Sequence, residues 1–296
     1  MENLGDDTPN RPGRTMLLII GGSGYLGSGL IRRAAADGHD VVATYATKPS
    51  DAEPTAWRCL DLRDVVSVEN LLDEVNPHAV INASSGLADW AITAEGPIPL
   101  ALATARRTIR LVHVSSDAVF SGDRVHYDES CSPDPITPYG AAKAAAETGV
   151  LAVHPAAAVA RTSLIIGDAQ SEHERLVHQL IDGTADGALF TDDIRCPVHR
   201  NDLAAALLEV AFSSAAGILH IAGPDALSRH ELGVLIAHRD GLDASHLATG
   251  LRAESSLPGA LDVRLDSRAA QQQLRTRLRG AREFLSPAAC PEQDGA

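Results

Sequence analysis

The segment Met16-Leu-Leu-Ile-Ile20, followed at once by Gly21-Gly-Ser-Gly-Tyr-Leu-Gly27, places an apolar run directly before a turn with glycines at every third position. In such a connection the chain turns sharply at Gly21, an anion approaches the backbone at Gly24, and the next helix packs closely at Gly27. A side chain would obstruct each of these steps, and the N-terminus of the helix faces the anion. The stretch therefore predicts a strand, a tight turn that binds the pyrophosphate of a dinucleotide, and a helix.

The residues beyond this turn alternate between two patterns. A helix-like stretch covers Tyr25–Asp37, and Ala/Leu-rich helical stretches separate most of the later apolar runs. Those later runs are Asp40–Thr44, Ala79–Asn82, Ile109–Ser115 and Ala156–Leu164. Strands that alternate with helices predict an α/β fold of the Rossmann type, in which a doubly wound parallel sheet lies between helices.

The pattern loosens after Gly167 into what we interpret as a smaller C-terminal α/β lobe that binds substrate. Its expected helices are Glu172–Asp182, Asn201–Phe212 and Ser228–His238, and its brief apolar segments are Cys196–Val198 and Ile218–Ile221. We expect a disordered leader over 1–14, a nucleotide-binding domain over 15–166, a substrate lobe over 167–285 from which some segments return to the sheet, and a frayed tail over 286–296.

Composition excludes several classes of partner. The 296 residues carry a formal net charge of −14 without a basic stripe and interleaved aromatic residues, so nucleic acid is not expected. Charge or proline interrupts every Ala-rich segment before it reaches the roughly 20 apolar residues of a membrane-spanning helix. The four cysteines include no C-x-x-C pair and the twelve histidines no H-E-x-x-H, which predicts reduced thiols in a cytoplasm and no metal site.

A tyrosine and a lysine are spaced for joint chemistry in the segment Tyr139-Gly-Ala-Ala-Lys143. It opens an Ala-rich helical stretch, so the two side chains lie at i and i+4 on one face and can meet the same ligand. A lysine ammonium can hold the ribose hydroxyls of a nicotinamide cofactor and lower the pKa of a neighbouring phenol, by about 4 kcal/mol for a charge about 4 Å away. Tyr139 can then pass a proton to a developing alkoxide while hydride arrives from the cofactor.

A third group is needed to orient the substrate carbonyl. The buried-type run Leu111-Val-His-Val-Ser-Ser-Asp117 ends in two hydroxyls, and we choose Ser116 because Tyr139 and Lys143 follow at a workable distance. The alternative is that Ser115 and Ser116 only cap a turn or a helix, as serines at strand ends often do. We therefore expect Ser116, Tyr139 and Lys143 to be the catalytic residues.

The end of the second strand bears on the choice of cofactor. NAD-preferring sites place an acid about 20 residues after the glycine turn, where it binds the ribose 2′-hydroxyl, but this chain has none there. Thr44 and Lys48 instead offer a hydroxyl and a cation to a 2′-phosphate, which favours NADPH and leaves NADH open. In the alternative interpretation Lys48 lies in a solvated loop and contacts nothing.

With these residues in place, the chain resembles the extended short-chain dehydrogenase/reductases, in the branch of the sugar-nucleotide-binding dTDP-4-dehydrorhamnose reductases. The similarity runs from about Met16 to Leu285. Its most specific stretches are Val114–Gly122, Tyr127–Glu129 and Pro138–Lys143 with Glu147; supporting pieces are Asp61–Leu62, Asn82–Ala83, Arg161–Ser163, Pro197–Val198 and Asp202–Leu203.

The resemblance implies roles for further residues. Tyr25 and Leu26 would bind cofactor within the glycine turn, Asp61 and Leu62 beside the adenine, and Asn82 and Ala83 at the end of the fourth strand. Substrate would meet Ser84, Asp117 and Ala118. Two departures fall at this substrate end, because the branch usually has a tyrosine where this chain has Ala118, and the run after Asn82 reads Ser-Ser-Gly-Leu.

Two classes of function follow. The first is an NAD(P)H-dependent ketoreductase that acts on the 4-keto group of a nucleotide-linked deoxysugar, with a sugar-nucleotide epimerase or dehydratase as a variant that would need a further acid or base, for which Asp117 is the nearby candidate. The second is a non-catalytic NADP-binding regulatory subunit. A homodimer is the default expectation for a soluble enzyme.

Overall fold

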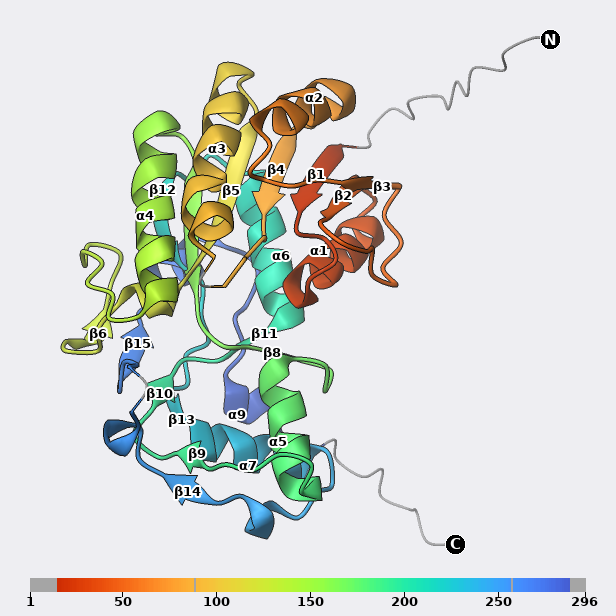
Figure 1. Ribbon diagram of the computed structural model, residues 1–296. Helices are drawn as coiled ribbons and strands as arrows, with labels where there is room; N and C mark the ends of the chain where they lie inside the picture. The colour runs from red at the N-terminus through yellow and green to blue at the C-terminus, as the bar shows by residue number, and fades with distance from the viewer. Residues whose placement is uncertain (1–14, 88, 257, 288–296) are drawn as a thin grey trace, which may run out of the picture.

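The structure is a computed structural model that describes residues 15–87, 89–256 and 258–287 (Figure 1). The predicted leader over 1–14, and the predicted tail beyond residue 287, lie outside the described residues.

A seven-stranded parallel sheet forms the centre of the larger lobe. Its order is β12-β7-β5-β4-β1-β2-β3. In chain order these strands are β1 (Met16–Ile20), β2 (Asp40–Tyr45), β3 (Ala56–Cys59), β4 (Ala79–Asn82), β5 (Arg110–Ser116), β7 (Ala158–Thr162) and β12 (Gly217–His220). The chain builds β2 and β3 on one side of β1 and then crosses to β4 on the other, so the direction of winding reverses between β1 and β4. Ligands of doubly wound sheets bind at the carboxyl ends of the strands beside such a reversal.

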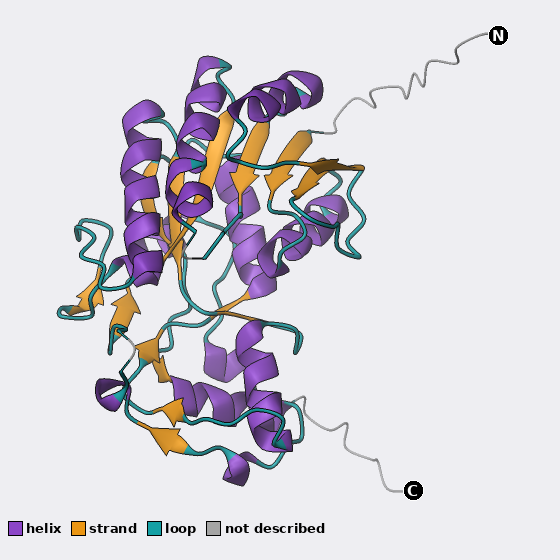
Figure 2. Ribbon diagram, viewed as in Figure 1, coloured by secondary structure: helices purple, strands orange, loops and turns teal. Residues whose placement is uncertain are grey.

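Helices cover both faces of this sheet, as Figure 2 shows. One face carries α1 (Tyr25–Ala36) and α6 (Arg200–Ala211), and the other carries α2 (Val65–Val75), α3 (Pro97–Arg106) and α4 (Pro138–Val153). Side chains alternate along β1. Leu17 and Ile19 point into the core between the sheet and helices α1 and α6, and Leu18 and Ile20 point into the core between the sheet and helices α2, α3 and α4. A strand buried on both faces must be apolar throughout, which explains the unbroken run that opens the fold.

The smaller lobe packs α5 (Glu172–Asp182) and α7 (Arg229–Arg239) around a third core. Serines cap both helices: Ser171 forms a capping box with Glu174, and Ser228 forms one with Glu231. The remaining short elements, most of which pair two by two, are β6 (Val125–Tyr127), β8 (Ile165–Ile166), β9 (Leu189–Phe190), β10 (Ile194–Arg195), β11 (Val198–His199), β13 (Leu227–Ser228), β14 (Thr249–Gly250), β15 (Val263–Leu265), α8 (Arg268–Gln273) and α9 (Ala281–Phe284).

The predicted Rossmann-type fold class is confirmed. Most predicted elements match the observed ones to within two residues, and helix Glu172–Asp182 matches at both ends. The sequence pattern does not predict strand β3. The run Ile218–Ile221 corresponds to the edge strand β12, so this segment of the chain after Gly167 returns to the large sheet. None of the described helices is both long and apolar enough to cross a membrane.

Close packing at the glycine turn holds β1, α1, β2 and β4 together. Gly21 has a φ of +78°, and a Cβ there would lie 2.7 Å from the Cα of Ser84. Its N–H donates to Oγ1 of Thr44, at 3.0 Å. A Cβ on Gly27 would overlap the carbonyl oxygen of Gly21, so α1 reaches the turn only because residue 27 has no side chain.

We expect Gly27→Ala to lower the free energy of unfolding by about 1–3 kcal/mol, because α1 must move away from the turn to admit the methyl group. The matched control is Gly24→Ala, where the added Cβ would lie 3.3 Å from the Gly21 carbonyl oxygen. Chemical denaturation should show a smaller loss for this control. Equal losses in the two variants would contradict the packing argument.

Candidate active site

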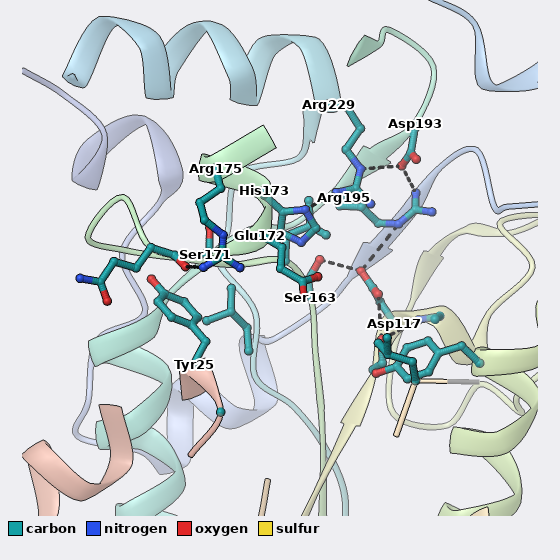
Figure 3. A pocket seen from close by; sticks show the side chains of 18 of the residues that line it. Tyr25, Asp117, Ser163, Ser171, Glu172, His173, Arg175, Asp193, Arg195 and Arg229 are labelled. Carbon is teal, nitrogen blue, oxygen red and sulfur yellow. Dashed lines mark hydrogen bonds and ion pairs between the residues drawn. The ribbon is translucent and has the colours of Figure 1, made fainter. Parts of the chain in front are cut away.

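A cleft of about 910 Å³ lies between the two lobes and contains the predicted catalytic end of the sheet. Its nucleotide-domain wall includes Gly24, Tyr25, Ser116 and Tyr139. Figure 3 shows the opposite wall, where the lobe directs charged side chains into the cleft. The labelled lobe residues there are Ser171, Glu172, His173, Arg175, Asp193, Arg195 and Arg229.

The fold brings two of the three predicted catalytic residues, Ser116 and Tyr139, to one end of this cleft. Ser116 ends β5, and Tyr139 lies in the first turn of α4, where Thr137 caps the helix by accepting the Gly140 N–H at 3.0 Å. Ser116 and Ser85 lie close enough to the Tyr139 phenol for their hydroxyls to lower its pKa. Ser116 also accepts the Ala118 N–H at 3.2 Å, so it caps a short 3-10 helix as well, as the alternative interpretation predicted.

Lys143 lies fully inside the protein, one helical turn after Tyr139. Its Nζ donates to the carbonyl oxygen of Val114 at 3.0 Å. Burial lowers the pKa of Lys143 to about 8, and the nearby Glu147 carboxylate opposes this shift.

The expected effect of Lys143 on the Tyr139 phenol is not found. The pKa of Tyr139 is raised, chiefly by burial and further by the Asp117 carboxylate, although the hydrogen bonds from Ser116 and Ser85 lower it. The Lys143 ammonium is directed toward the Val114 carbonyl, so the i, i+4 spacing alone does not lower the pKa of the phenol.

A buried ion pair lies beneath this group of residues. Arg161 of β7 donates from Nη2 to Oε2 of Glu147 at 2.8 Å, and the two side chains are only 2% and 3% exposed. Ser115 donates to Oε1 of the same carboxylate at 2.5 Å. Ser115 and Ser116 thus separate into a buried structural hydroxyl and one that lines the cleft.

The residues predicted to bind cofactor are found in several environments. Thr44 is buried with its hydroxyl on the Gly21 N–H, whereas Lys48 is exposed in the loop after β2. Asp61 forms an exposed ion pair with Arg63, at 2.6 Å. Tyr25 donates to Oδ1 of Asp168 at 3.2 Å and lies under the Arg200 guanidinium. Leu26 and Leu62 are buried, and Ala83 packs against the core. Their contacts with a cofactor stay a prediction.

At the end of β4, Asn82 organises the segment beside the glycine turn. Its Oδ1 accepts both the N–H and the hydroxyl of Ser84, at 3.1 and 2.6 Å. Its Nδ2 lies 3.2 Å from Nδ1 of His113, a buried histidine whose pKa burial holds well below the usual value. Sequence reasoning missed His113 because a single histidine inside a strand carries no positional signal.

Of the other predicted substrate residues, Asp117 and Ala118 line the cleft. The Asp117 carboxylate is engaged on both oxygens: Ser163 donates to Oδ2 at 2.6 Å, and Ser116 donates to Oδ1 at 3.3 Å. Arg195 approaches the same Oδ2 from the smaller lobe, with Nε at 3.7 Å. Arg195 carries no signal in the sequence, since isolated arginines in a lobe of irregular pattern resemble ordinary surface charges.

The part of the chain that the structure describes contains no group of three or more histidine, cysteine or acidic side chains arranged to hold a metal ion.

Comparison with known proteins places the chain in a family. The model of the RmlD substrate binding domain family matches residues 15–286. The chain belongs to that family. The dTDP-4-dehydrorhamnose reductase of Mycobacterium tuberculosis is 33% identical over 72% of this chain and 71% of its own length. The "Probable low-salt glycan biosynthesis reductase Agl14" of Haloferax volcanii is 30% identical over 82% of this chain and 86% of its own.

A solved structure supports the same fold. The dTDP-4-dehydrorhamnose reductase of Bacillus anthracis, crystallised in complex with NADP, superposes with a TM-score of 0.78 at 22% identity, over 92% of this chain and 97% of that one. As a member of this family with reductases among its relatives, the chain is an NAD(P)-dependent oxidoreductase.

We expect Lys143 to make stability depend on pH. Its pKa falls from 10.5 to about 8 on folding, so between these values the unfolded chain binds a proton that the folded chain does not. Raising the pH through this window therefore stabilises the fold, by about 3 kcal/mol in total, and the gain is lost as the pH falls back through 8.

Urea denaturation across this window measures the effect as the difference between wild type and Lys143→Met. The free energy of unfolding of wild type should rise relative to the variant as the pH increases. Lys48→Met changes the only other lysine, and its free energy of unfolding should follow the same dependence on pH as that of wild type. A Lys143→Met profile parallel to wild type would show that Lys143 does not titrate in this range.

Proposed function

We propose that the protein is an NADPH-dependent ketoreductase that reduces the 4-keto group of a nucleotide-linked deoxysugar. The main support is that Ser116 and Tyr139 line one end of a cleft whose other wall is rich in arginine, with buried Lys143 one helical turn after Tyr139.

The glycine turn fits a dinucleotide cofactor. The N-terminus of α1 opens on the cleft at Gly24, and the space a Cβ would take at Gly24 is restricted only by the Gly21 carbonyl oxygen. Backbone N–H groups at a helix N-terminus suit a pyrophosphate. Asp61 and Leu62 would bind the adenosine end, Asn82 and Ala83 the nicotinamide end. When bound, the cofactor supplies hydride.

Side chains of the protein would orient the substrate carbonyl and donate the proton. Ser116 would donate a hydrogen bond to the carbonyl oxygen, and Tyr139 would donate the proton that the oxygen takes up during reduction. Burial keeps the pKa of Tyr139 raised, so the phenol holds its proton at neutral pH, which is the state that reduction requires. Lys143 would hold the ribose hydroxyls of the cofactor.

Charge in the cleft supports a phosphorylated substrate. Although the whole chain carries a net charge of −14, five arginines line the cleft: Arg32, Arg175, Arg195, Arg229 and Arg252. Guanidinium groups match the geometry of phosphate oxygens. The diphosphate of a nucleotide sugar would lie against the arginines of the lobe wall other than Arg195, which is already engaged by Asp117 and Asp193. Near Tyr139, the exposed apolar side chains of Leu87 and Ile136 would face the methyl group of a deoxysugar.

The environment of Asp117 favours ketone reduction over epimerisation or dehydration. Those reactions need a further acid or base that is free to exchange a proton near the reacting carbon. Both oxygens of Asp117 are already occupied by Ser116, Ser163 and Arg195. A cytoplasmic location and a homodimer remain predictions.

Tyr139→Phe should abolish turnover while leaving cofactor binding in place. Loss of a general acid costs about 10²–10⁴-fold in kcat. The assay follows NADPH oxidation with a dTDP-4-keto-6-deoxy sugar, and cofactor affinity is measured separately by fluorescence. The matched control is Tyr45→Phe, which removes a phenol at the end of β2 and should retain activity.

If the wild type binds NADPH but does not turn over this or related keto sugars, the ketoreductase proposal fails. That result would favour the regulatory-subunit hypothesis. Turnover that survives in Tyr139→Phe would instead remove Tyr139 from the mechanism.

Lys48 provides a test of cofactor preference. If its ammonium meets the 2′-phosphate, Lys48→Ala should weaken NADPH binding about three- to tenfold, as expected for an exposed charge pair on a phosphate, and should leave NADH binding unchanged. Binding titrations with both cofactors make the comparison. An equal change for both would show that Lys48 is a solvated loop residue.

A further inference from the structure

A row of alternating charges crosses from the catalytic end of the sheet into the smaller lobe (Figure 3). Asp117 is followed by Arg195, whose Nε lies 3.7 Å from Asp117 Oδ2, and Arg195 Nη1 lies 3.0 Å from Asp193 Oδ1. The same Asp193 oxygen lies 3.3 Å from Nε of Arg229. The side chains of Asp117, Arg195 and Asp193 are less than 10% exposed, so water screens these charges weakly.

The members of this row belong to different lobes. Asp117 directly follows β5 of the nucleotide-binding sheet, whereas Arg195 ends β10 and Arg229 begins α7. Arg195 is fixed within its own lobe because its guanidinium also donates to the carbonyl oxygens of Ala260 and Leu261, at 2.7 and 3.2 Å. It therefore presents a rigid positive charge to the other lobe.

Asp117 pairs with this charge and also acts on the proposed proton donor. Its carboxylate accepts the Ser116 hydroxyl, and Ser116 lines the same end of the cleft as Tyr139 and acts on the pKa of that phenol. The negative charge of Asp117 raises the pKa of Tyr139. A cation paired with Asp117 opposes that effect, since it offsets the carboxylate charge that the phenol experiences.

We propose that Arg195 is a positioning residue for the reaction: from the substrate lobe it holds Asp117 against Ser116 and so links lobe placement to the proton donor Tyr139. The proposal rests on the ketoreductase function proposed above. It assigns no direct contact between Arg195 and the reacting atoms.

The other charged and titratable groups that face Asp117 do not replace Arg195. From α4 there is Tyr139 itself, and from the residue after β10 there is Cys196, whose pKa burial raises to about 11, so that it is neutral near pH 7. Arg229 of α7 also acts on Asp117, but its Nε is paired with Asp193. Arg195 is thus the cation in direct contact with the carboxylate among the described residues.

The experiment compares pH profiles of kcat and kcat/KM for wild type, Arg195→Gln and Arg195→Lys. In Arg195→Gln, we expect kcat to fall about three- to tenfold with a smaller change in KM, because an acid weaker by about one pKa unit transfers the proton more slowly. Lys143 loses its proton near pH 8, so the profile contains two alkaline steps, and only the upper one, where the Tyr139 proton is lost, should move to higher pH by about one unit. The kcat and the upper alkaline step of Arg195→Lys should lie between those of wild type and those of Arg195→Gln.

A second substitution separates charge from simple loss of structure. Asp117→Asn in the Arg195→Gln background removes the carboxylate that Arg195 no longer neutralises, so the upper alkaline step should return toward its wild-type position. The matched control is Arg277→Gln, which breaks an exposed ion pair with Glu283 at 2.6 Å and should leave the profile unchanged. An Arg195→Gln profile with wild-type pH dependence would overturn the proposal, as would a shift that Asp117→Asn does not reverse.

A measurement without substrate keeps this test independent of the proposed function. Tyrosinate absorbance, recorded directly after a pH jump and referenced to Tyr139→Phe, reports ionisation of Tyr139 alone. Arg195→Gln should raise its midpoint even if no keto sugar is turned over. No turnover by wild type together with a raised midpoint would reject the ketoreductase and retain the effect of Arg195 on Tyr139; an unchanged midpoint would reject the role of Arg195.

Discussion

The buried ion pair between Glu147 and Arg161 fixes helix α4 on the sheet, and the arrangement of the site depends on it. A carboxylate or a guanidinium in this apolar layer is tolerated only with its partner, so neither chain segment can slide without leaving an unpaired charge. Glu147 lies one turn after Lys143 and two turns after Tyr139 on the same helix. By accepting the Ser115 hydroxyl it also holds the end of β5, where Ser116 follows.

The same carboxylate affects the charge of the site. Lys143 is buried as deeply as the ion pair, and its desolvation would favour the neutral amine even more strongly without the negative charge of Glu147 one turn away. The Val114 carbonyl holds the ammonium at a defined point. Position and protonation of Lys143 are therefore set by α4 and β5 together, before any ligand contributes.

Local sequence patterns predict much of the fold and of the candidate site. The glycine turn and the Tyr139–Lys143 spacing are read from neighbouring residues, and each depends on geometry that a few residues define. Strand β3, with the sequence Ala-Trp-Arg-Cys59, was missed because it is short and has neither an apolar run nor alternation; pairing with β2 makes it a strand. Arg195 and His113 were missed for a related reason, since their importance comes from partners far away in the sequence.

The wrong expectation for the Tyr139 pKa shows where spacing fails as a guide to electrostatics. The i, i+4 relation places two side chains on one helix face, but it does not say where a flexible ammonium points or how much water surrounds the phenol. Here burial acts on both groups in the direction of the neutral form, raising the pKa of Tyr139 and lowering that of Lys143. A phenol that keeps its proton can act as a general acid, so the desolvation that weakens the predicted charge pairing is compatible with the proton donation proposed for Tyr139.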